Sequence, residues 1–259
     1  PVSIIDANTG IEAIDKAIEE LYQTGYMHNH VRMYTAAIAC NNSQSHWKIP
    51  AQWMYYHLID GDWASNALSW QWVAGSNANK KYYANQENIN KYCYTRQQST
   101  FLDVPYSAFN QMSIPEVLQE TSTPEFKTTL PTTSNPTIDA SVPTLIYNYY
   151  NLDPNWRSSE KANRILLMEP SKFQQYPISK NAMDFMLNLA NDNIEDIQIY
   201  AGEFQELQKN FDIQDIIYKE HPLNYNYSGK EDPRDWMFSV KGYYRSFFAF
   251  WKKCKMELK

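Results

Sequence analysis

The stretches TGYMHNHVRM at residues 24–33 and LIDGDWASNALSWQW at residues 58–72 carry the strongest pattern in this chain, with WKIP at 47–50 between them. In both stretches, selected polar and apolar residue types recur three and four positions apart, which is the spacing of one helix face. Gly61 interrupts the second stretch, and glycine is the residue that most readily permits a sharp bend. The pattern predicts helices on either side of a tight turn.

Two sets of side chains follow from this spacing, and each set shares one helix face: Asn29, Arg32 and Met33; Asp62, Asn66 and Trp70. The turn also places two carboxylates, Asp60 and Asp62, close together. Neighbouring carboxylates raise each other's pKa unless a cation lies nearby. Arg32 is the natural cation, because a planar guanidinium can pair with a carboxylate at two points.

Working outward, the surrounding sequence predicts a helical bundle. Thr9 and Glu12 have the spacing of a capping box, and Gly25 is placed to end the helix that follows. Apolar residues then recur with a helical period and without strand-like alternation. The predicted helices cover residues 9–25, 27–40, 50–60 and 62–74.

The sequence changes character after this region. Residues 105–143 hold six of the thirteen prolines and a run rich in Thr and Ser, which is typical of a tether or a surface loop. Beyond them, apolar segments alternate with helical patterns, which favours a small parallel α/β layer. The predicted strands are residues 144–150, 164–170, 197–204 and 215–222, and the predicted helices are 180–191, a short one near 206, and 242–258.

Composition limits the classes of function. The chain has 259 residues, 43% of them hydrophobic, so it can bury a core, and its formal net charge of −6 argues against an extended nucleic-acid surface. Seven glycines make a Gly-rich phosphate loop improbable, and three scattered cysteines indicate reduced thiols in the cytoplasm. No apolar run of membrane-spanning length occurs, so we expect no membrane partner. Because the chain begins with Pro1, we expect it to be a fragment.

The ordered motifs resemble one known family. A Tyr before Met-His-Asn, an Arg three residues past that Asn, a Leu-Ile-Asp-Gly-Asp turn and a Trp-Gln-Trp occur in the order that is found in the flavin-binding helical region of photolyases and cryptochromes. The resemblance covers roughly residues 9–75. It implies a partial helical bundle of the photolyase FAD-binding type over 1–104. Together with the Pro/Ser/Thr-rich linker over 105–143 and the small α/β domain over 144–259, which composition and pattern predict, the expected fold is mainly α.

The resemblance also implies roles for individual residues, with FAD as the cofactor. Arg32 would pair with Asp60 beside the flavin ring, and Asn66 would face the N5 edge of that ring. Residues that would bind the cofactor are Arg32, Asp60, Asp62, Asn66 and Asn29; those that would relay electrons are Trp70 and Trp47; those that would contact the lesion or DNA are Asn29, His30, Met33 and Trp72. By the same resemblance, the third tryptophan, the phosphate-binding segment and the rest of the lesion pocket lie upstream of Pro1.

Two features depart from the family pattern. Asn85 and Gln86 stand in the segment 80–92 where an Arg and an apolar residue are expected, and residues 1–105 carry seven basic against nine acidic residues. Both features weaken the expectation of duplex DNA binding. The spacing of His28, His30 and His57 fits no standard zinc pattern, so no metal site is predicted.

Three functions therefore stay open. The first is a light-dependent carbon–carbon lyase resembling deoxyribodipyrimidine photolyase, acting on DNA that contains pyrimidine dimers. The second is a cryptochrome-type blue-light photoreceptor that signals to a protein partner, with the C-terminal unit as the contact. The third is a scaffold with a decayed flavin fold. A tryptophan-rich helix is more often packed core than an electron relay, so only the ordered motif favours the first two.

Overall fold

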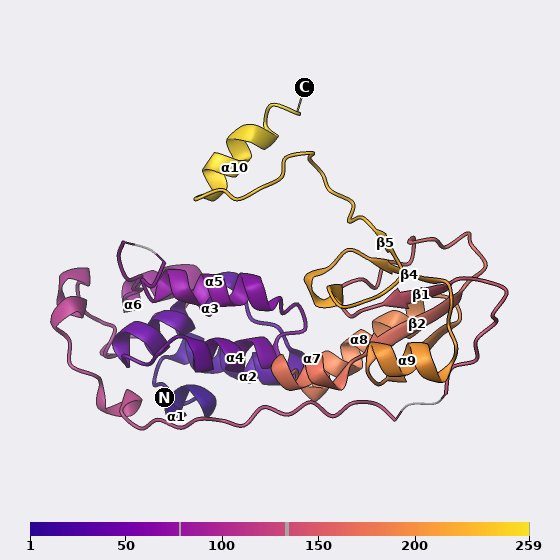
Figure 1. Cartoon of the computed structure of the whole chain (residues 1–259). Coiled ribbons are helices and arrows are strands. Elements are labelled where there is room, and N and C mark those ends of the chain that lie inside the picture. The colour runs from indigo at the N-terminus through magenta and orange to yellow at the C-terminus, as the bar shows by residue number, and fades with distance from the viewer. Residues whose placement is uncertain (78, 133–134, 259) are drawn as a thin grey trace. The chain divides into compact units, whose positions relative to one another are not determined.

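A computed structural model describes residues 1–77, 79–132 and 135–258 (Figure 1). The chain forms two compact units. The helical unit comprises Pro1–Thr132 and Met168–Asp192, and the sheet unit comprises Thr133–Leu167 and Asn193–Lys259. Residues 133 and 134 of the predicted linker lie outside the described residues. The domain boundaries predicted from the sequence stay predictions.

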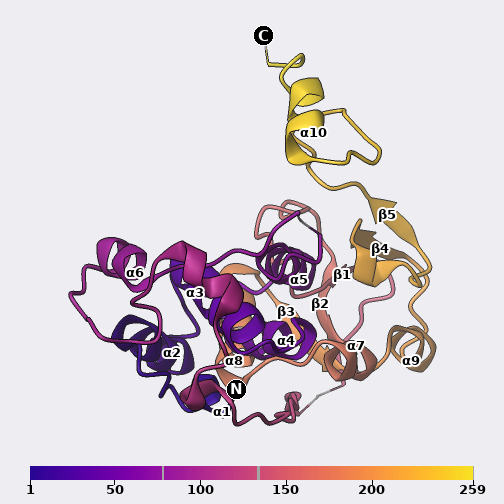
Figure 2. The same cartoon turned by 90° about the vertical axis from the view of Figure 1, so that its left-hand side faces the viewer.

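The helical unit confirms the expected mainly helical region, and each of the four predicted helices is present. Three of them lie within the predicted bounds, whereas the helix Lys48–His57 begins and ends earlier than the predicted 50–60. In this unit, α5 (Trp63–Val73) packs against both α3 (Asn29–Ala37) and α4 (Lys48–His57) (Figure 2). The α-helices are α1 (Val2–Ile5), α2 (Glu12–Thr24), α3 (Asn29–Ala37), α4 (Lys48–His57), α5 (Trp63–Val73), α6 (Gln86–Cys93), α7 (Pro170–Gln175) and α8 (Lys180–Asn193). A π-helical turn, η1 (Ile38–Asn42), follows α3 directly, and two 3-10 turns are η2 (Tyr106–Gln111) and η3 (Glu116–Leu118).

Helix α2 forms because an apolar stripe of Ile14, Ile18 and Leu21 is completely buried in the helical core. The predicted capping box at its start is wrong. Ile11 is the N-cap residue, and the amide and hydroxyl of Thr9 donate instead to the Asp15 carboxylate at 2.7 and 2.6 Å. A carboxylate one turn inside the helix thus binds the chain that precedes it.

Gly25 ends α2 as predicted and also places the turn that leads to Asp60. Its φ of +73° is left-handed, and its amide donates to the carbonyl of Leu21. The carbonyl of Gly25 accepts a hydrogen bond from the amide of Ile59 at 2.9 Å. A Cβ atom at position 25 would lie 2.4 Å from Cγ2 of Ile59, so a side chain there is excluded by space as well as by conformation.

The Pro-rich segment is partly packed into the helical unit. Phe109 in η2 is 4% exposed and Leu118 at the end of η3 is fully buried, and both belong to the helical core. Residues 106–118 therefore contribute to that core instead of lying over the surface as a simple loop.

The sheet unit confirms a small parallel α/β layer. Its strands are β1 (Thr144–Tyr147), β2 (Asn163–Met168), β3 (Ile197–Ala201), β4 (Ile216–Lys219) and β5 (Lys230–Asp232), in the order β3-β2-β1-β4-β5. The pairs β1–β2, β1–β4 and β4–β5 are parallel. The sequence did not predict β5. The remaining helices are α9 (Phe204–Asn210), η4 (Pro222–Asn224) and α10 (Phe247–Cys254).

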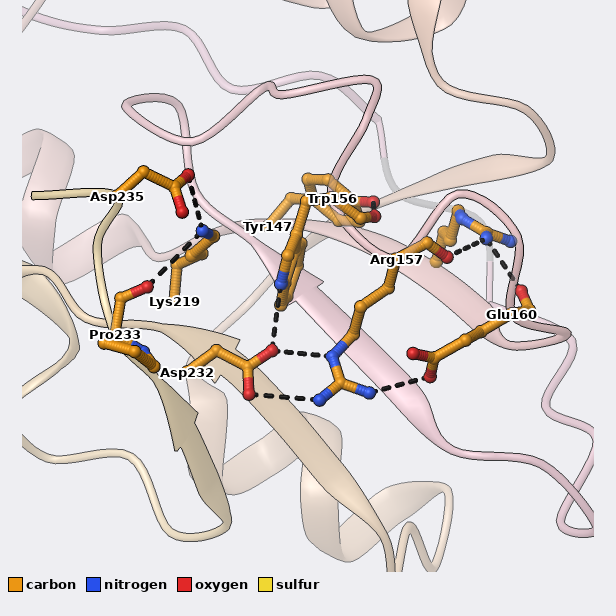
Figure 3. A network of polar contacts seen from close by, with 9 residues as sticks. Tyr147, Trp156, Arg157, Glu160, Lys219, Asp232, Pro233 and Asp235 are labelled. Carbon is orange, nitrogen blue, oxygen red and sulfur yellow. Dashed lines mark hydrogen bonds and ion pairs between the residues drawn. The ribbon is translucent and has the colours of Figure 1, made fainter.

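A polar network fastens the edge strand β5 to the turn that precedes β2 (Figure 3). The guanidinium of Arg157 donates to both carboxylate oxygens of Asp232, at 2.6 and 3.1 Å, and to Glu160 at 2.7 Å. The indole of Trp156 also donates to Asp232, at 3.1 Å. These donors hold the pKa of Asp232 below its ordinary value, because they stabilise its ionised form.

Burial of His57 makes the stability of the helical unit sensitive to pH. The ring lies at the end of α4, 4.6 Å from the ring centre of Tyr22 and 4.9 Å from that of Tyr56. Burial lowers the pKa of His57 from 6.5 to about 4, because the charged imidazolium loses its hydration. As the pH falls from 6.5 towards 4, the unfolded chain takes up the proton first, so stability that is present above pH 6.5 is lost.

We expect the free energy of unfolding to fall by about 1–2 kcal/mol more between pH 7 and pH 5 in the wild type than in His57→Phe. Urea unfolding at the two pH values measures the difference. The exposed His46 supplies the control, because His46→Phe should keep the pH dependence of the wild type. Equal pH dependence in His57→Phe and the wild type would show that His57 is not the group responsible.

Candidate functional site

A cavity of about 450 Å³ opens between α3, α4, α5 and the turn at residues 58–62. Its walls combine polar groups with apolar and aromatic ones, as is common in small-molecule sites. The polar lining residues are Asn29, Arg32, Asp60, Asp62, Ser65, Asn66 and Ser69, and the larger apolar ones are Met33, Met54, Leu58, Leu68, Trp70, Trp72 and Val73. Both three-residue helix faces that the sequence singled out therefore meet at one cavity.

Arg32 and Asp60 form an ion pair at this cavity. One terminal nitrogen of Arg32 donates to both carboxylate oxygens of Asp60, each at 3.0 Å. Nε of Arg32 donates to the backbone carbonyl of Met27 at 2.7 Å, which holds the guanidinium from a second side. The Asp60 side chain is 55% exposed, so the pair by itself adds little to folding stability, and its orientation towards the cavity matters more.

Asp62 and Asn66 also have structural partners that sequence spacing did not reveal. Asp62 is the N-cap residue of α5, and its carboxylate accepts a hydrogen bond from the amide of Ser65 at 2.7 Å. The amide nitrogen of Asn66 donates to the carbonyl of Ala51 in α4 at 2.8 Å. This bond joins α5 to α4 and fixes the plane of the Asn66 amide where it lines the cavity.

The two tryptophans of the expected relay have different surroundings. Trp70 is only 2% exposed and forms part of the cavity wall. Among the described residues that line the cavity, Trp47 does not occur. It is half-buried against the same hydrophobic core that contains Trp70, with its ring 5.6 Å from that of His46. The two indoles thus share one apolar core, but only Trp70 reaches the cavity.

Three of the four residues expected to contact a lesion also lie at the cavity: Asn29, Met33 and Trp72. Trp72 is 46% exposed, so its ring faces both the cavity and solvent. His30 does not belong to the described cavity lining and stacks instead on Tyr92, with ring centres 5.2 Å apart and planes 7° apart.

A second hollow, about 760 Å³ in volume, adjoins Trp72 and was missed by sequence reasoning. Lys80, Lys81, Tyr82 and Tyr83 line it. The sequence signal for this hollow is two lysines followed directly by two tyrosines. Asn85, which departs from the family pattern, is the N-cap residue of α6, and Gln86 is buried at 1% exposure.

Asn41, which sequence reasoning also missed, holds the segment 80–83 that lines the second hollow. It lies in the π-helical turn η1 and is 6% exposed. Its amide nitrogen donates to the carbonyls of Val73 and Tyr82, at 2.9 and 2.7 Å. One buried side chain therefore ties the end of α5 to the far end of the loop that carries Lys80 and Lys81. π-helical turns often mark functional sites.

We expect Asn41→Leu to loosen this loop, because the carbonyl of Tyr82 loses the Asn41 donor at a cost of about 1–3 kcal/mol, whereas the carbonyl of Val73 keeps the backbone amide of Tyr82 at 3.0 Å. Trypsin cleavage after Lys80 or Lys81 should then accelerate by about tenfold or more, since proteolysis follows the population of the open loop. Asn42→Leu is the matched control, because Asn42 lies in the same turn at the same 6% exposure, and within the described residues its side-chain amide donates to the sulfur of Met112, at 3.9 Å, and not to the loop. Equal acceleration in both variants would rule out a specific role for Asn41.

The three histidines considered for a metal site do not come together. His28 stacks on His30, with ring centres 5.4 Å apart, whereas His57 lies among Tyr22, Trp53 and Tyr56. Over the part of the chain that the structure describes, no three His, Cys, Asp or Glu side chains are grouped so that they could hold a metal ion.

Comparison with known proteins places the cavity in a family context. The family model described as the FAD binding domain of DNA photolyase matches residues 5–124. Several similar curated proteins carry the name deoxyribodipyrimidine photo-lyase. The one from Agrobacterium fabrum is 43% identical over 70 residues, which is 27% of this chain and 15% of the relative. The one from Buchnera aphidicola is 31% identical over 144 residues, 56% of this chain and 28% of the relative.

The deoxyribodipyrimidine photo-lyase from Escherichia coli is 35% identical over 78 residues, which is 30% of this chain and 16% of the relative. The matched part of the chain thus spans less than a third of the length of each of these relatives. No solved structure matches the chain.

Proposed function

Through residues 5–124 this chain belongs to the photolyase/cryptochrome family, and from this premise we propose that it holds FAD in the cavity between α3, α4 and α5 for light-driven repair of pyrimidine dimers in DNA. The single observation that carries the proposal is that Arg32, Asp60, Asn66 and Trp70 line one cavity. These residues come from two helices and the turn before α5, so their meeting is a property of the fold.

The residues present suit a flavin ring. A volume of about 450 Å³ lies in the range of small-molecule sites. A planar ring with one polar edge needs apolar walls and a few fixed hydrogen-bonding groups. Met54, Leu58 and Trp70 offer the walls, while the Arg32–Asp60 pair and Asn66 offer fixed polar groups. When bound, FAD would supply the light-driven one-electron chemistry.

The chain's own residues would bind and orient the cofactor and donate electrons to it. Arg32 and Asp60 would hold the polar edge of the ring, Asn66 would set the surroundings of its N5 edge, and Asp62 and Asn29 would add contacts. Trp70 would give an electron to the resting cofactor, and Trp47 would then pass an electron to the oxidised Trp70. Asn29, His30, Met33 and Trp72 would contact an extruded dimer, which must leave the base stack to be reached. On this proposal the protein is a carbon–carbon lyase like deoxyribodipyrimidine photolyase.

The test has two stages. First, the purified full chain is mixed with FAD, and its absorption spectrum is recorded after removal of free cofactor. Second, the flavin-loaded protein is given a single-stranded oligonucleotide with one thymine dimer under blue light, and dimer loss is measured. A yellow protein that repairs the oligonucleotide supports the proposal. A protein that takes up no flavin contradicts it and favours the scaffold function.

A second candidate is a cryptochrome-type photoreceptor, which would keep the flavin and the tryptophans but signal to a protein partner. The excess of acidic over basic residues in 1–105 favours it, because a polyanion is repelled by such a surface. A yellow protein whose flavin is reduced by light but which leaves the dimer intact would select this function over repair.

A further inference from the structure

The C-terminal segment, residues 236–258, has a charge balance opposite to that of the whole chain. It holds five basic residues and one acidic residue, whereas the chain holds 23 basic and 29 acidic residues. The carboxylate of the acidic residue, Glu257, accepts hydrogen bonds from the amide and the hydroxyl of Ser239, at 2.8 and 2.5 Å. Among the described residues, none of the five cations forms an ion pair: Lys241, Arg245, Lys252, Lys253 and Lys255.

The same segment exposes large apolar side chains. In α10, the final helix in Figure 1, Phe247 is 66% and Phe248 is 79% exposed. Soluble proteins rarely leave a group of such side chains in water unless it meets a partner. The other large apolar side chains exposed in the segment are Trp236, Met237, Tyr243, Met256 and Leu258.

Helix α10 divides these two kinds of residue between its faces. Phe247, Trp251 and Cys254 lie four and then three positions apart, on one stripe, and the rings of Phe247 and Trp251 are stacked with centres 6.2 Å apart. Lys252 and Lys253 follow Trp251 and project to either side of this stripe. An aromatic face with lysines at both borders is typical of a helix that lies in a membrane interface.

We propose that the C-terminal segment is a binding site for an anionic lipid surface. Five cations without an ion pair attract an anionic partner, and the exposed Phe, Met and Leu side chains favour one that also offers hydrocarbon. Met256 and Leu258 have no ring to stack on a nucleic-acid base, whereas the acyl region of a bilayer accepts them. Over the described part of the chain, every helix is too short or too polar to cross a membrane. On this proposal α10 therefore lies along the membrane surface and does not span the bilayer.

This contact differs from a membrane-spanning segment, for which the chain has no apolar run of sufficient length, and it departs from the expectation that no membrane is a partner. It is also independent of the cavity, because none of the residues that line the cavity belongs to the segment. Cofactor uptake and lipid binding can therefore succeed or fail separately.

The full chain is tested by flotation with vesicles of phosphatidylcholine mixed with phosphatidylserine, and with vesicles of phosphatidylcholine alone. We expect binding to the mixed vesicles that is at least about tenfold stronger than to the neutral ones and that falls as salt is raised. Phe247→Ser with Phe248→Ser should abolish it, and Lys252→Glu with Lys253→Glu should reduce it at least about tenfold. All four side chains are exposed, so these changes leave the buried core intact and remove only surface ring contacts, such as those of Phe247 with Phe248 and Trp251.

Lys16→Glu with Lys48→Glu is the control, because it makes the same change of charge at exposed positions of the helical unit and should leave vesicle binding unchanged. Three outcomes overturn the proposal. Equal binding to neutral vesicles shows adsorption without a role for charge. Binding of a DNA oligonucleotide that the phenylalanine changes abolish, without vesicle binding, assigns the segment to nucleic acid. Concentration-dependent self-association that those changes abolish assigns it to a second copy of the chain.

Discussion

Replacing Arg32 with alanine is expected to weaken FAD binding by about tenfold to a hundredfold, because hydrogen bonds to a charged group are worth about 1.5–3 kcal/mol. The guanidinium is fixed between the carboxylate of Asp60 and the carbonyl of Met27, so it meets a ligand without having to be ordered first. Its loss also leaves Asp60 as an uncompensated acid at the cavity. Quenching of flavin fluorescence during titration of the full chain measures the affinity.

Arg32→Lys separates charge from geometry. Lysine keeps the cation but lacks the planar set of donors that reaches Asp60 and Met27 together, so we expect an affinity between those of the wild type and Arg32→Ala. Arg96→Ala is the matched control, since Arg96 is exposed and does not line the cavity. FAD binding of wild-type strength in Arg32→Ala would remove the ion pair from the proposed site.

The helical region could be predicted because local signals and burial agree there. The stripe of Ile14, Ile18 and Leu21 has a helical period, and Gly25 supplies the left-handed residue that ends α2. The start of α2 could not be predicted in the same way. A capping box and an Asp15 carboxylate that binds back to Thr9 use similar residue types at similar spacing, and only the packed chain decides between them.

Features that depend on partners distant in sequence were missed. Strand β5 is three residues long and carries Lys, Glu and Asp, so it has no strand-like pattern, and it forms only because β4 offers a free edge and Arg157 binds Asp232. The role of Asn41 is similar. Its two acceptors are more than thirty residues away, at Val73 and Tyr82, and no local spacing indicates them.

The residues of the candidate site were found from helix spacing and family resemblance, but their supporting bonds were not. Spacing correctly groups Asp62, Asn66 and Trp70, because all three line the cavity. It does not reveal that Asp62 caps α5 or that Asn66 holds α5 against Ala51. These bonds fix where the side chains stand, so a substitution at either position would alter helix packing together with any ligand contact.

Substitution of Trp70 separates its role in the core from its role as an electron donor. Trp70→Phe keeps an aromatic ring in the cavity wall, where the indole is only 2% exposed. We expect FAD to bind with nearly unchanged affinity, but light-driven reduction of the bound flavin to slow by about tenfold or more, equal to about 1.4 kcal/mol or more on the barrier. Phenyl is far harder to oxidise than indole, so the substituted side chain cannot give up an electron in its place.

Trp53→Phe is the control that makes this prediction specific. Trp53 is 3% exposed in the same core, and its indole donates to the hydroxyl of Tyr22 at 3.0 Å, yet it does not line the cavity. Both variants lose similar buried volume, and Trp53→Phe also loses the hydrogen bond to Tyr22, so it should be at least as destabilised as Trp70→Phe; unfolding curves of the two variants measure this. Slow photoreduction in Trp70→Phe alone assigns the electron to Trp70, whereas equal slowing in both variants would attribute the effect to a loosened core and remove Trp70 from the relay.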